Sequence, residues 1–70
     1  MYKNEEIIDE LGGKRSVANY LGIGVSAVYL WFFKKPKGNE GRIPPKQAIK
    51  IHKLAQEKGL NYTIEEILGE

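Results

Sequence analysis

The stretch from residue 14 to residue 33 constrains the fold more than any other part of the chain. It reads KRSVANYLGIGVSAVYLWFF, with apolar residues at helical spacing on both sides of Gly22-Ile23-Gly24. Glycine most easily takes the positive φ that is often needed just past a helix C-terminus. The small Ala18 would let a second helix cross closely over the first. The pattern predicts a helix-turn-helix, with an ordinary helical hairpin as the alternative.

The expected core of this segment comes from side chains that face inward from both helices. Val28 and Trp31 are three residues apart and therefore share one face of the second helix. Ile23 should fill the corner between the helices, and Trp31 should pack against Ile23 and the helix that follows residue 44. The structural residues of the segment are predicted to be Ala18, Leu21, Gly22, Ile23, Val28 and Trp31.

The length of 70 residues indicates a single domain, residues 1–70, near the lower limit for a core without disulfides or metal. The absence of cysteine excludes disulfides, a thiolate nucleophile and a cysteine zinc site. The N-terminal sequence MYKNEEIIDEL has no continuous apolar run, so we expect no signal peptide. No stretch approaches the roughly 20 apolar residues that cross a bilayer. We expect a soluble, cytoplasmic protein that does not contact a membrane.

The net charge of +2 is unevenly distributed along the chain. Residues 1–13 and residues 54–70 each carry four acidic side chains and one lysine. Residues 14–53 carry nine lysines and arginines against a single glutamate, Glu40. A basic middle segment concentrates positive potential there, as a polyanion-binding surface requires. A merely solvated charged surface is the alternative interpretation.

The periodicity predicts a compact all-α bundle of five helices with no repeats and no long linker. Asn4 is expected to cap the first helix, and Pro36 to stop the third, because the residue before proline avoids helical φ and ψ. Thr63 and Glu66 match a capping box for the fifth helix. The helices should span about residues 4–11, 14–21, 25–34, 45–58 and 64–68, with an exposed basic loop or small hairpin-like wing over residues 35–44.

The outward face of the second helix of the motif follows from a turn of 100° per residue, which places Tyr29 and Leu30 away from Val28 and Trp31. In a DNA-binding helix-turn-helix, the N-terminal part of this helix enters the major groove. The candidate groove-facing residues are Gly24, Val25, Ser26, Tyr29 and Leu30. The candidate phosphate-binding residues are Lys14, Arg15, Lys34, Lys35, Lys37 and Arg42.

The run LGGKRSVANYLGIGVSAVYLW, followed by GRIPPKQAIKIHKLA, resembles the small Cro-type repressors of bacteriophages and their prophage relatives over roughly residues 2–58. Those proteins are lambda-repressor-like in fold, with an A-x-x-L-G-[IV] helix-turn-helix, a tryptophan late in the third helix and a G-x-I-P-P start of the fourth. The matching residues here are Gly12, Gly13, Ala18, Leu21, Gly22, Ile23, Val28, Trp31, Gly41, Ile43, Pro44 and Pro45.

The resemblance implies a sequence-specific transcriptional repressor in a bacterial cell that binds a double-stranded DNA operator as a dimer and acts by occupying it. The dimer could form before or upon DNA binding, through Phe32 and Phe33 with the following loop, or through Ile64, Ile67 and Leu68. Two departures stand out. The groove-facing positions are largely apolar, where the family usually has polar residues. The loop before G-x-I-P-P is also longer, with KKPKGNE inserted.

Other chemistries have weak sequence support, so we expect no enzyme, no cofactor, no metal and no small-molecule ligand. His52 is the only histidine, and its place in the fourth predicted helix suits a rim residue. Adjacent acidic pairs such as Glu65 and Glu66 diverge around a helix and do not form a paired acid and base. The alternatives to a repressor are a DNA-binding antitoxin and a protein-interaction module that uses the aromatic residues of the third helix.

Overall fold

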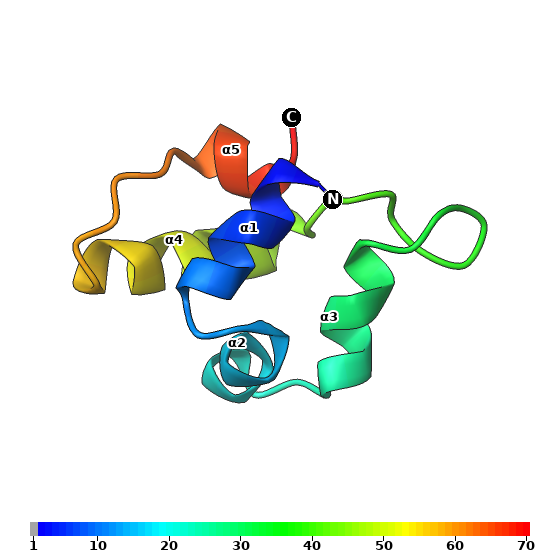
Figure 1. The fold of residues 1–70 in the computed structure, drawn as a ribbon, viewed down its shortest axis with the longest axis horizontal. Coiled ribbons are helices and arrows are strands. Elements are labelled where there is room, and N and C mark those ends of the chain that lie inside the picture. The colour runs from blue at the N-terminus through cyan, green and yellow to red at the C-terminus, as the bar shows by residue number, and fades with distance from the viewer. Residues whose placement is uncertain (1) are drawn as a thin grey trace.

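Five α-helices and no strand make up the regular structure of residues 2–70, the part of the chain that this computed structural model describes. The helices are α1 (Lys3–Glu10), α2 (Lys14–Leu21), α3 (Val25–Trp31), α4 (Pro45–Glu57) and α5 (Ile64–Leu68) (Figure 1). The predicted all-α fold class is confirmed. The second and fifth helices have the predicted bounds, and the fourth ends one residue early.

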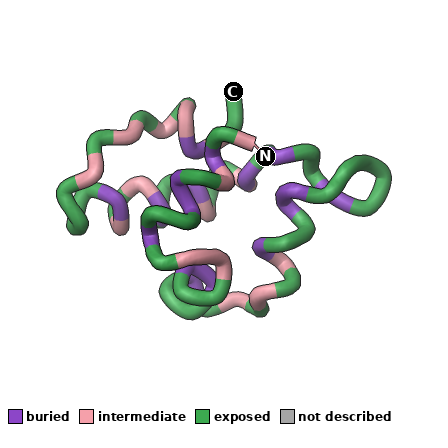
Figure 2. Tube along the Cα trace, viewed as in Figure 1, coloured by how far each residue is buried: buried purple, intermediate pink, exposed green. Residues whose placement is uncertain are grey.

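The core lies where the apolar stripes of all five helices meet (Figure 2). α1 packs on α2 and α5, and α4 packs on the same two helices from the other side. Each fully buried aliphatic side chain contributes about 1.5–3 kcal/mol relative to exposure. The largest side chains of this kind are Ile7, Ile8, Leu11, Val17, Val28, Ile51 and Ile67.

The capping box predicted for α5 is present. The Thr63 N–H donates to Glu66 Oε1 at 2.9 Å, and the Glu66 N–H donates to Thr63 Oγ1 at 3.1 Å. The hydrogen bond from the Thr63 backbone holds the pKa of the Glu66 carboxyl below its usual value. This local pattern fixes where α5 begins, as the sequence alone indicated.

The backbone of α3 approaches α2 more closely than any other helix of residues 2–70, while Val28 and Trp31 reach into the common core. The C-terminus of α3 is held by the segment that follows it: the Asn39 N–H donates to the Leu30 carbonyl at 3.1 Å, and the Gly41 N–H to the Trp31 carbonyl at 2.6 Å. The prediction that this helix runs to about residue 34 is wrong. It ends at Trp31 because the returning loop takes its last carbonyls, so Pro36 is not what stops it.

The loop that returns to α3 is partly buried, which corrects the prediction of an exposed loop. Its lysines are exposed, but Gly38, Gly41 and Ile43 are buried. A Cβ at Gly38 would lie 2.3 Å from the Leu30 carbonyl oxygen and 2.5 Å from Phe33 Cβ. Only glycine fits there, so the loop has a fixed close approach to α3 and no strand.

Phe32 also departs from its predicted role as a dimer contact. Its side chain is buried, and its ring lies 6.3 Å from the Tyr2 ring and 6.5 Å, edge-on, from the Trp31 ring, measured between centroids. Ile67 is likewise buried in the core. Phe33 remains exposed, and Ile64 and Leu68 are half-buried.

Asn4 is not the N-cap of α1, as the sequence suggested. Tyr2 occupies that position, and Asn4 lies inside the helix with only 2% of its surface exposed. Its side-chain amide donates to the Ile67 carbonyl at 3.1 Å and to the Gly41 carbonyl. One amide therefore joins α1 to α5 and to the loop that holds the end of α3.

Replacing Asn4 with leucine should destabilise the fold markedly, because the carbonyls of Gly41 and Ile67 would be buried without a donor. Each orphaned group costs about 1–3 kcal/mol, and each kcal/mol lowers Tm by roughly 4–8 °C in a domain of this size. Thermal melts followed by circular dichroism measure the change. Asn19→Leu, on the exposed face of α2, is the control; equal melting of the two variants would contradict this role of Asn4.

Candidate nucleic-acid interface

The outward face of α3 carries Ser26, Tyr29 and Leu30, all exposed to solvent. Tyr29 is 47% exposed and Leu30 is 43% exposed, whereas Val28 and Trp31 on the opposite face are 0% and 5% exposed. Of the other candidate groove residues, Gly24 is exposed, and Val25 is half-buried against the core. The face therefore combines two hydroxyl groups with large apolar surface.

The connection between α2 and α3 sets the direction in which this face points. Gly22 ends α2 in the left-handed conformation, with φ of 72°. The Ile23 N–H then donates back to the Ala18 carbonyl at 3.0 Å. Ala18 is buried between the helices, and Ile23 is half-buried beside the core. Three residues thus turn the chain closely enough for α3 to pack across α2 (Figure 1).

Lys14 does not point freely into solvent as a phosphate contact would. Its Nζ lies 2.9 Å from Glu5 Oε2, and the two side chains are only 16% and 18% exposed. The same Nζ lies 5.2 Å from the centroid of the Tyr29 ring and 5.5 Å from that of the Phe32 ring. The first residue of α2 is therefore joined to α1 and to the outward face of α3. Arg15, next along α2, is exposed.

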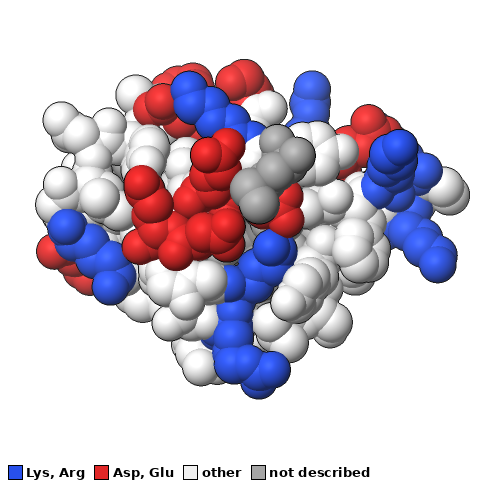
Figure 3. All heavy atoms as spheres, viewed as in Figure 1, with Lys and Arg blue, Asp and Glu red and all other residues white. Residues whose placement is uncertain are grey.

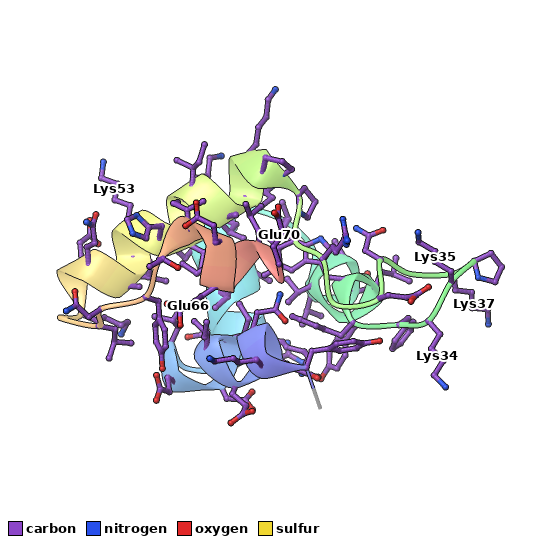
Figure 4. The ribbon with its side chains drawn as sticks, turned by 90° about the horizontal axis from the view of Figure 1, so that it is seen from above. Lys34, Lys35, Lys37, Lys53, Glu66 and Glu70 are labelled. Atoms are coloured by element: carbon purple, nitrogen blue, oxygen red, sulfur yellow. The ribbon has the colours of Figure 1, made fainter. Side chains whose placement is uncertain are left out.

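The cations of the loop are exposed and extend in different directions. Lys34 and Lys35 extend to opposite sides of the loop, and Lys37 lies near its tip (Figure 4). Lys53, on α4, lies at the other end of the molecule in the same view. The basic middle segment of the sequence is therefore spread over the start of α2, the loop and α4. Acidic side chains gather over α1 and α5 (Figure 3).

A hollow of about 600 Å³ lies between α3 and the start of α4. Trp31 borders it with Ile23, but the indole itself is only 5% exposed and belongs to the buried core, whose members include Ala48 and Ile51 of α4. The oxygen of the Gln47 side chain, which also lines the hollow, is buried without a hydrogen-bond partner within residues 2–70.

The part of the chain that the structure describes holds no group of three or more histidine, cysteine or acidic side chains that could bind a metal ion. None of its helices combines the length and the apolar character needed to cross a membrane. His52 is half-buried on α4.

Comparison of the chain with protein-family models, with curated proteins and with solved structures finds no match.

The contact between Glu5, Lys14 and Tyr29 is the part of the candidate interface that sequence reasoning missed. Glu5 and Lys14 belong to different helices, nine positions apart, and no helical spacing rule joins them. A signal was nevertheless present: a lysine as the first residue of a helix is unfavourable against the positive end of the helix dipole. Such a residue needs a nearby anion, and the preceding acidic helix supplies one.

Alanine at Gly22 should lower the free energy of unfolding by about 1–2 kcal/mol, since an L-residue is strained in the left-handed conformation. Asparagine should cost less, because its short polar side chain tolerates that conformation. Urea unfolding measures both. Gly59→Ala is the matched control, since Gly59 has φ of 75° and also has open space around it.

The control should cost a similar free energy without disturbing α3, whereas Gly22→Ala should shift the amide NMR signals of α3. Unchanged α3 signals in Gly22→Ala would show that the left-handed glycine does not orient this helix.

Proposed function

We propose that this chain is a sequence-specific, double-stranded DNA-binding transcriptional repressor of the Cro type, acting by operator occupancy in a bacterial cytoplasm. The observation that carries the proposal is the exposed face of α3, with Ser26, Tyr29 and Leu30, which the connection to α2 holds in place; α2 also carries the exposed Arg15. In this proposal α2 and α3 form a DNA-binding helix-turn-helix, and α3 enters the major groove.

The chemistry of the α3 face suits a thymine-rich site. Leu30, with the partly accessible Val25, would contact thymine C5-methyl groups, which are the apolar feature of the major groove. The hydroxyls of Ser26 and Tyr29 would bond to a base edge or to a phosphate. No side chain on this face offers the bidentate pairing of arginine with guanine, so DNA shape would supply part of the specificity.

The phosphate contacts in this proposal come from exposed cations around α3: Arg15 from α2, and Lys34, Lys35, Lys37 and Arg42 from the loop. Backbone N–H groups at the start of α2, which has no side-chain cap, would add to them. Such contacts position the protein on any sequence. Their number sets the salt dependence, with about −0.9 in the slope of log K against log salt for each phosphate.

A dimer on a roughly palindromic site is part of the proposal, because one recognition helix reads only a few base pairs. The half-sites would lie about one helical turn apart. With Phe32 and Ile67 in the core, the apolar contacts that remain for a second copy are Phe33 beside the loop, and Ile64 with Leu68 on α5.

A protein-binding role on the same scaffold, as an antitoxin or an interaction module, is favoured by one observation. Tyr29, Leu30 and Phe33 are each more than two-fifths exposed at the C-terminal half of α3 and just beyond it. Apolar side chains grouped on a surface often mark a contact with another molecule. Selection from random duplex DNA, followed by sequencing of the bound fraction, distinguishes the two: a repressor enriches one motif, and a pure interaction module enriches none.

Leu30→Ser and Tyr29→Ala should each weaken binding to the selected duplex by about tenfold, since loss of a specific base contact costs roughly 1–3 kcal/mol. For Leu30→Ser, binding to a random duplex should hardly change, because the leucine side chain makes no phosphate contact. Fluorescence anisotropy measures both affinities. Ile49→Ser is the matched control, as Ile49 is 61% exposed on α4, outside the proposed interface. If neither variant affects either duplex, α3 is not the recognition surface.

A further inference from the structure

The Lys14 ammonium is enclosed by three different parts of the fold. Glu5 of α1 forms the ion pair at 2.9 Å, Tyr29 of α3 presents its ring at 5.2 Å, and the Phe32 ring lies at 5.5 Å. Each contact favours a cation, since a carboxylate attracts it through its charge and aromatic faces through their quadrupole. Lys14 is thus held at the edge of the Tyr29 face and away from solvent.

The position of Glu5 in the fold favours its ion pair with Lys14. It lies in the first turn of α1, next to Asn4, whose buried amide fixes that turn to α5 and to the loop. Lys14 is the first residue of α2, where the N-terminal end of the helix dipole disfavours a positive charge. The Glu5 carboxylate offsets both the ammonium and the dipole. The pair therefore presents almost no net charge beside Tyr29.

A phosphate oxygen at the start of α2 would need the Lys14 ammonium, which Glu5 already holds. An ammonium group and the free N–H groups at a helix N-terminus are the usual ligands of a phosphodiester oxyanion in proteins. At the start of α2, the Lys14 ammonium already has an intramolecular partner, the Glu5 carboxylate. A DNA backbone that reaches the Tyr29 face would have to compete with Glu5 for Lys14.

We propose that Glu5 is an internal competitor of DNA phosphate for Lys14, and so limits the sequence-independent attraction of the α3 face for DNA. The inference rests on the proposed DNA-binding function and adds a regulating residue that does not touch DNA. Since a phosphate contact is the same for every sequence, releasing Lys14 strengthens binding to specific and random duplexes by the same factor.

The test compares Glu5→Gln with Glu6→Gln in salt titrations on a random and a selected duplex of about 20 base pairs, two helical turns. Glu6 is the neighbouring exposed glutamate, and Lys14 is paired with Glu5, so both variants lose one negative charge and only Glu5→Gln frees Lys14. Glu5→Gln should bind both duplexes more tightly than Glu6→Gln at low salt. Its slope of log K against log salt should be steeper by about one unit.

The double variant Glu5→Gln with Lys14→Met should lose this extra affinity and slope, because the freed ammonium is what produces them. Equal behaviour of Glu5→Gln and Glu6→Gln overturns the inference. A change on the selected duplex alone also overturns it, since Glu5 would then orient Tyr29 and not compete with phosphate. Failure of the wild-type protein and Glu5→Gln to bind any duplex overturns the proposed function as well, so the two failures are distinct.

A second measurement needs no variant and covers the case in which Glu5→Gln does not fold, which its thermal melt would reveal. The rings of Tyr29 and Phe32 should shift the side-chain NMR signals of Lys14 upfield in the free protein. Adding the random duplex to the wild-type protein should leave those signals in place while the signals of Arg15 move. Displacement of the Lys14 signals toward ordinary lysine values would show that phosphate takes Lys14 despite Glu5.

Discussion

The side-chain amide of Asn4 is the interaction on which the arrangement of the remaining elements depends. It bonds the carbonyls of Gly41 and Ile67, from a loop and a helix far along the chain. The Gly41 N–H in turn holds the last carbonyl of α3, at Trp31. The backbone of α3 lies closest to α2, and this short chain of hydrogen bonds anchors its C-terminal end. The candidate interface is therefore supported by α1 and by the loop as well as by α2.

Close approach of backbone makes that anchor specific. A Cβ at Gly41 would lie 2.6 Å from the Tyr2 ring, and one at Gly69 would lie 2.5 Å from the Gly41 carbonyl oxygen. Contacts of this length do not occur between real side chains and backbone, so glycine is required at both positions. The loop, the start of α1 and the end of α5 consequently fit together in one way, and the loop enters α4 at a defined point.

The sequence was sufficient where local rules decide the structure. Periodicity located the five helices, Gly22 located the left-handed turn, and Thr63 with Glu66 located the start of α5. The sequence did not predict the structure where contacts between distant segments determine it. Asn4 satisfies every local rule for a cap, yet its amide is taken by carbonyls 37 and 63 positions away. Phe32 continues the apolar pattern of α3, but the returning loop ends that helix first.

The same limit applies to the candidate interface. Helical geometry identified the outward residues of α3, because burial of Val28 and Trp31 leaves Tyr29 and Leu30 no other direction. The state of Lys14 could not be derived in this way, because it depends on how α1 packs against α2. A count of basic residues treats every lysine as available, whereas packing gives one of them an acidic partner.

The position of Trp31 gives the protein an optical property of practical use. It is the only tryptophan in the chain, and its indole borders the hollow between α3 and the start of α4. Indole emission depends on the polarity around the ring, and all of this emission comes from the single position beside the hollow. Any molecule that fills the hollow, or any separation of α3 from α4, would therefore change the colour of the protein's own fluorescence without an added label.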